Sequence, residues 1–146
     1  MSPLAEKMLY EAKNPGKTLW IYHEKYDSGS IKYTKIKEEK DLGKFGSRSV
    51  CYLTEDLGDS FVLRGGLFGD PSKDPIRKKF NDAYFILEVP RHDPDLVRIV
   101  EELGSDKASG NCSKLEIIDI GENLYHIDEY DGYETVITDL PGNYWQ

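Results

Sequence analysis

Two glutamates in the last part of the chain have the spacing that most suggests chemistry. Asp131-Gly132 lies between two runs of strand-forming residues, which is the sequence pattern of a two-residue type I′ hairpin turn. Such a turn would place Glu129 directly opposite Glu134, with their Cβ atoms about 5 Å apart. Like charges in this position reduce the stability of a hairpin, so the pair calls for a physical explanation.

Three interpretations of the glutamate pair stay open. The carboxylates could be solvated at the hairpin tip, they could form an acidic surface for a basic protein, or they could hold a divalent cation or act as an acid/base pair. The turn already uses Asp131 and no further run of ligands follows, so the sequence predicts no metal site and no cofactor. The second interpretation predicts these partner-binding residues: Asp128, Glu129, Tyr130, Asp131, Tyr133 and Glu134.

The charge of the chain is concentrated in the same region. The net charge is −8, from 27 acidic and 19 basic residues, and residues 115–146 contain eight acids with no Lys or Arg. A field of this sign repels phosphate backbones and attracts basic surfaces. We therefore expect a basic protein surface as the partner and no direct binding of nucleic acid.

The sequence lacks the usual motifs of an enzyme. It contains no G-x-S-x-G, G-x-x-x-x-G-K-[ST], H-E-x-x-H or G-x-G-x-x-G. An alternative function would use cations around a predicted surface loop over residues 64–79. Arg64, Arg91 and His92 could then bind an anion, because His92 directly precedes a predicted helix N-terminus. This alternative predicts a small-molecule or nucleotide-binding protein, or a minor hydrolase.

The hydrophobic pattern indicates an α+β fold. Ser2-Pro3 predicts a helix start, and Asp93-Pro94 predicts a second helix that ends at Gly104. Between and after them we expect about seven or eight short strands in a mostly antiparallel sheet, with one or two packed helices. The predicted strands cover residues 18–23, 31–37, 48–54, 60–64, 83–89, 115–120, 124–130 and 133–138. The lysines of the second strand indicate solvent exposure or an edge strand.

Length and composition favour one domain over residues 1–146, with an acidic meander over residues 114–139. No apolar stretch is long enough to span a membrane, and the N-terminus resembles no secretory signal. Cys51 and Cys112 predict one buried thiol and one loop thiol in a reducing cytoplasm. Self-association through edge strands, giving a homo-oligomer, is a third hypothesis for the function.

The residues from Asp93 to Val136 carry a family resemblance. The run Glu102-Leu103-Gly104, the later Leu115-Glu-Ile-Ile and the hairpin Ile127-Asp-Glu-Tyr-Asp-Gly-Tyr-Glu134 resemble a family of short phage and bacterial proteins. Those proteins end in an I-x-E-Y-D-G-x-E-type hairpin, and this chain departs from their pattern after Val136. The resemblance implies a phage or mobile-element origin, a host cytoplasm as the compartment and no particular activity. An inhibitor of a host protein is the function that we expect from this combination.

Overall fold

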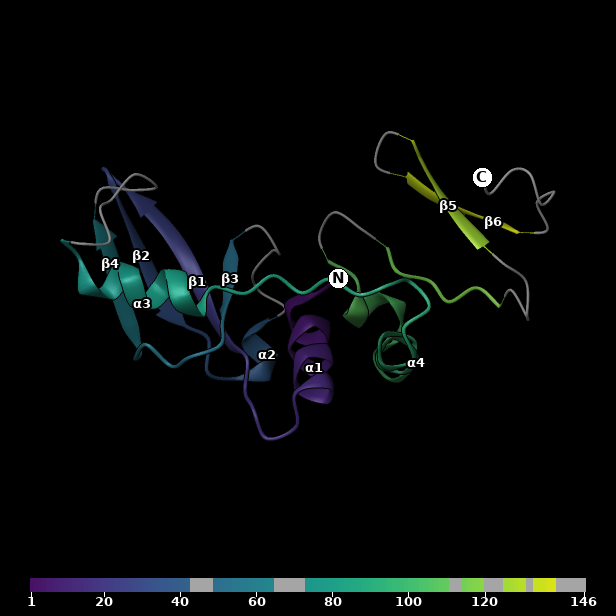
Figure 1. Ribbon diagram of the computed structural model, residues 1–146, viewed down its shortest axis with the longest axis horizontal. Helices are drawn as coiled ribbons and strands as arrows, with labels where there is room; N and C mark the ends of the chain where they lie inside the picture. The colour runs from purple at the N-terminus through teal and green to yellow at the C-terminus, as the bar shows by residue number, and fades with distance from the viewer. Residues whose placement is uncertain (43–48, 65–72, 111–113, 120–124, 131–132, 139–146) are drawn as a thin grey trace. The chain divides into compact units, whose positions relative to one another are not determined.

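The computed structural model describes residues 1–42, 49–64, 73–110, 114–119, 125–130 and 133–138 (Figure 1). The chain forms two compact units, unit 1 (Met1–Glu116) and unit 2 (Ile117–Gln146). One domain over the whole chain stays a prediction. Over the described residues the α+β class is confirmed, with four helices and six strands. No helix in these ranges has the length and apolarity needed to cross a membrane.

Unit 1 contains an antiparallel sheet in the order β3-β1-β2-β4 (Figure 1). Its strands are β1 (Trp20–Asp27), β2 (Ser30–Lys35), β3 (Val50–Leu53) and β4 (Ser60–Arg64). A tight turn joins β1 to β2, and Gly29 adopts a φ of +81° there, which glycine tolerates without strain. The lysines of β2 do not mark an edge, because β2 lies inside the sheet. Lys32 is exposed since alternate residues of β2 point to solvent.

One face of this sheet packs under helix α3 (Pro75–Ala83). Asp74 caps the helix by accepting a hydrogen bond from the Ile76 N–H, and Pro75 occupies its first turn. Phe80 of α3 contacts the rings of Tyr33 and Phe61. The buried residues of this core are Tyr22, Ile31, Tyr33, Cys51, Leu53, Leu63 and Ala83.

Helix α3 overturns two predictions. Residues 75–79 were predicted as part of a surface loop, but they are helical, and Arg77 is buried; residues 65–72 lie outside the described residues. Residues 83–89 do not form a central strand. Within this range only Tyr84 forms a β-bridge, and its partner is Leu53, the last residue of β3. The apolar side chains here pack elsewhere: Phe85 contacts Tyr10, and Leu87 and Val89 pack against a helical core.

This helical core joins α1 (Pro3–Lys13) to α4 (Pro94–Ala108). Helix α2 (Glu39–Leu42) packs near the sheet face opposite to the one that α3 covers. Both helix starts were predicted, with Ser2 and Asp93 as the N-caps. The Ser2 hydroxyl also donates to the Lys107 carbonyl at 2.6 Å, which ties the start of α1 to the end of α4. The predicted stop at Gly104 is present as a break: its φ of +79° and ψ of 162° are not helical, and helical residues resume after it as far as Ala108.

Unit 2 contains a two-stranded antiparallel sheet of β5 (Tyr125–Tyr130) and β6 (Tyr133–Thr138). The predicted meander of three strands is therefore wrong, because residues 115–119 are not in a strand; residue 120 lies outside the described residues. With residues 83–89 and 115–119 excluded, the described residues form six strands in two sheets instead of seven or eight strands in one. The same described residues form four helices instead of one or two.

Candidate functional site

The β5–β6 hairpin has the register that the sequence predicted. Glu129 pairs with Glu134, and Tyr130 pairs with Tyr133 next to the turn. The Glu134 side chain is exposed, whereas the turn residue Asp131 lies outside the described residues. Paired positions on adjacent antiparallel strands share one face, so the backbone directs two acidic residues to the same side of the hairpin.

The register joins the predicted partner-binding residues into one short segment. Asp128 pairs with Thr135, one position farther from the turn than the glutamate pair. Over the residues that the structure describes, no three His, Cys, Asp or Glu side chains gather in a group that could hold a metal ion.

The cations of the alternative site lie on different elements. Arg64 is the exposed last residue of β4, whereas Arg91 and His92 are exposed in the turn before α4. Figure 1 shows β4 and α4 at separate places in unit 1. The N-terminus of α4 already holds a carboxylate of the chain, because Asp93 accepts the Asp95 and Leu96 N–H groups. Since Asp93 fills the position where an external anion would bind, this helix end offers little to a ligand.

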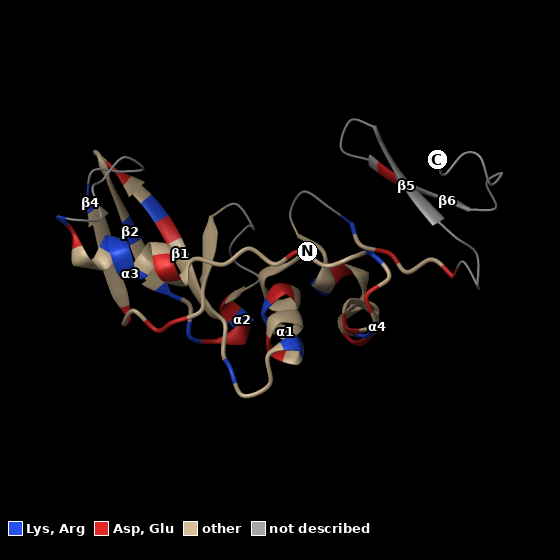
Figure 2. Ribbon diagram, viewed as in Figure 1, with Lys and Arg blue, Asp and Glu red and all other residues tan. Residues whose placement is uncertain are grey.

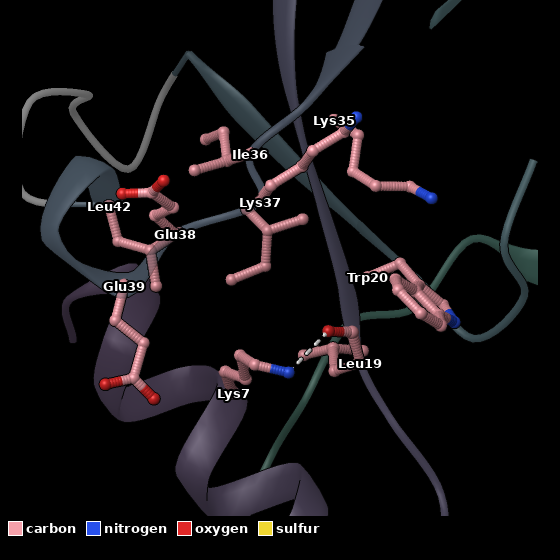
Figure 3. Close-up of a pocket in the computed structure, with 10 residues that line it drawn as sticks. Lys7, Leu19, Trp20, Lys35, Ile36, Lys37, Glu38, Glu39 and Leu42 are labelled. Atoms are coloured by element: carbon pink, nitrogen blue, oxygen red, sulfur yellow. Dashed lines mark hydrogen bonds between the residues drawn. The ribbon is translucent and has the colours of Figure 1, made fainter. Parts of the chain in front are cut away.

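A hollow of about 300 Å³ lies between the start of β1, the end of β2 and helices α1 and α2 (Figure 3). Three lysines line it: Lys7, Lys35 and Lys37. Each forms an ion pair within the chain: Lys7 with Glu11, Lys35 with Asp56 and Lys37 with Asp59. Figure 3 also shows the Lys7 ammonium donating to the Leu19 carbonyl at 3.2 Å. Among the described residues, the lining contains no Ser, Cys or His, and its three lysines are paired with carboxylates.

A half-buried carboxylate lies on the sheet face beneath α3. Glu24 pairs with Tyr33 across β1 and β2, and Cys51 of β3 lies beside them. Burial raises the pKa of the Glu24 carboxyl, while the Cys51 thiol and the Tyr33 hydroxyl act as neighbouring donors and oppose that rise. Burial also raises the pKa of the Cys51 thiol far above its usual range, so this cysteine is not a reactive nucleophile.

Two exposed tyrosines extend this group toward solvent. Tyr26 follows Glu24 by two residues on the same face of β1 and is 67% exposed. Tyr84 is 49% exposed, and its pKa is raised first by burial and then by the nearby Glu24, Cys51 and Tyr26. We call these five residues the Glu24 cluster: Glu24, Tyr26, Tyr33, Cys51 and Tyr84.

The Glu24 cluster was not predicted from the sequence, because the predicted first strand ends at His23. The strand continues to Asp27, so Glu24 and Tyr26 lie on the same face as Tyr22. The alternation of large aromatic residues at positions 20, 22 and 26 was the signal that could have extended the strand. Tyr84 joins the cluster because it is the C-cap residue of α3. No local pattern in the first strand could predict that position.

We expect Glu24→Gln to raise the melting temperature more at pH 8 than at pH 4, with a difference of about a few degrees. A carboxyl whose pKa is raised in the folded state stabilises the fold fully below its unfolded pKa. That contribution is lost as the pH rises through the folded pKa, and an amide escapes the loss. Thermal melts of both proteins between pH 4 and pH 8 measure this, and a larger gain at pH 4 would contradict it.

Charges are distributed differently in the two parts of the chain. Residues 1–114 contain as many basic as acidic residues, and Figure 2 shows both kinds on the elements of unit 1.

A scan against protein-family models, a search of curated proteins and a search of solved structures each found no match to this chain. The resemblance of residues 93–136 to a family of phage and bacterial proteins therefore stays a prediction.

Proposed function

We propose that this protein is a non-enzymatic binding protein whose β5–β6 hairpin docks on a basic surface of a protein partner. The observation that carries the proposal is the register of the hairpin, which pairs Glu129 with Glu134. This pair lies in a segment of 32 residues with eight acids and no Lys or Arg. The binding residues are those given above, from Asp128 to Glu134.

Repulsion between the paired carboxylates gives a basic partner an energetic advantage. Two like charges directly opposite one another destabilise a hairpin in isolation. A Lys or Arg placed between them would replace this repulsion with attraction and with charge-assisted hydrogen bonds. The uniform sign of residues 115–146 would also accelerate the encounter with a basic protein.

The hairpin also has features that suit a contact surface. Tyr130 and Tyr133 form the pair next to the turn, and tyrosine supplies a large contact area with little loss of side-chain entropy. An isolated two-stranded hairpin is marginally stable in water, so packing against a partner would stabilise it. If the chain is encoded by a phage, as its family resemblance implies, the partner is a host protein and the chain inhibits or modulates it.

We expect the double variant Glu129→Lys/Glu134→Lys to lose the basic partner proteins that the wild type captures. Reversing both charges replaces attraction with repulsion, and each charged contact at an interface contributes about a tenfold or larger change in affinity. The measurement is affinity capture of the tagged protein from bacterial lysate at 50 mM and 500 mM salt, quantified by mass spectrometry. The captured proteins are then purified and titrated individually against both forms.

Glu101→Lys/Asp106→Lys is the matched control, because both residues are exposed on α4 and the change in net charge is the same. This control should retain the partner at low salt, and circular dichroism should show both variants folded. Equal recovery of the same basic proteins with the hairpin variant and the control would refute the proposal.

A further inference from the structure

The charge of Glu24 is not balanced within the part of the chain that the structure describes. Its side chain is half-buried on the face of the sheet that packs under α3, and none of the described Lys, Arg or His residues forms an ion pair with it. Buried carboxylates in proteins are normally paired with a cation, because removing an unpaired charge from water is costly. A carboxylate kept in this position is therefore a candidate for binding a cation from outside.

The donors around Glu24 leave hydrogen-bond acceptor positions for such a cation. The Tyr33 hydroxyl and the Cys51 thiol are neutral donors, so they stabilise the carboxylate without cancelling its charge. A carboxylate accepts about four hydrogen bonds, so two neighbouring donors leave acceptor positions for a bidentate ligand. Arg77 of α3 is a buried cation of the same unit, and its Nη2 donates to the Arg64 carbonyl at 2.9 Å.

The exposed tyrosines determine which cation fits best. Tyr26 and Tyr84 lie near the carboxylate and expose much of their surface, although large aromatic residues are usually more buried. An aromatic face attracts cations, and a guanidinium can stack on it while it donates two parallel hydrogen bonds to a carboxylate. An ammonium lacks that planar geometry and is more strongly hydrated, so a guanidinium is the better ligand.

We propose that the Glu24 cluster binds the guanidinium group of an arginine presented by a protein partner. Glu24 accepts the two N–H groups of the guanidinium, and Tyr26 and Tyr84 contact its faces. This site lies wholly in unit 1 and does not depend on the hairpin of unit 2. It would give the protein a second recognition surface, specific for one arginine side chain instead of a broad basic region.

A titration with Nα-acetyl-arginine methylamide, followed by NMR of the ¹⁵N-labelled full chain, tests this proposal. We expect the signals of Glu24, Tyr26 and Tyr84 to shift together with a single dissociation constant. The citrulline analogue has nearly the same shape without the charge, and it should leave these signals unchanged. Glu24→Gln should weaken arginine binding about tenfold or more, because the amide cannot form the charge-assisted pair.

Two control variants separate this site from general acidity. Asp27→Asn also removes a carboxylate from β1, but on the opposite face, and should bind the arginine compound like the wild type. The hairpin variant Glu129→Lys/Glu134→Lys should also bind it normally, so failure of the hairpin proposal would not affect this result. The inference is overturned if the arginine and citrulline compounds shift the same signals, or if a folded Glu24→Gln protein binds as tightly as the wild type.

Discussion

Replacing Ile99 with alanine is expected to lower the free energy of unfolding of unit 1 by about 2–5 kcal/mol. Ile99 of α4 is fully buried, and it packs in the core where α4 meets Ala5 and Leu9 of α1. Removing three carbons from such a position loses the transfer free energy of those atoms and leaves a cavity. The position lies between two helices that the Ser2 contact also holds together, so the backbone has little freedom to close the cavity.

Urea denaturation followed by circular dichroism measures this loss. Ile99→Val is the graded control, with an expected loss of about 0.5–1.5 kcal/mol, because it removes a single methylene from the same site. A loss below that of the valine variant would show that α1 and α4 do not form a close-packed core.

Tyr22→Phe is expected to cost about 1–3 kcal/mol although it removes only one oxygen atom. The Tyr22 ring is fully buried in the core under α3, and its hydroxyl reaches the loop between β3 and β4. This hydroxyl accepts the Leu57 N–H at 3.0 Å and donates to the Gly58 carbonyl at 2.9 Å. Phenylalanine would keep the packing but lose both hydrogen bonds, and the partly buried Leu57 N–H would be left without this partner.

Tyr10→Phe is the matched control for this prediction. Tyr10 is also buried, at the edge of the Phe85 ring, but its hydroxyl forms no hydrogen bond with the described residues. We expect its loss of stability to be smaller than that of Tyr22→Phe in the same denaturation experiment. Equal losses from both variants would mean that the Tyr22 hydroxyl does not stabilise the loop.

Local sequence determined the elements whose ends carry their own signals. Ser2 and Asp93 accept hydrogen bonds from the first turns of α1 and α4, as their position before a proline predicts. The Asp131-Gly132 pair predicted the register of β5 and β6, because a two-residue turn permits only one pairing of the flanking strands. The glutamate pair, and with it the proposed binding surface, could therefore be found from sequence alone.

Tertiary structure decided what the apolar segments do. Residues 83–89 have the composition of a buried strand, yet they end α3 and then pack along α1, since apolar side chains gain the same free energy from either environment. The Glu24 cluster likewise depends on three strands and the end of α3, which lie up to 60 residues apart, between Glu24 and Tyr84. Local patterns encode turns and caps through nearby hydrogen bonds, whereas contacts between distant segments depend on how the whole core packs.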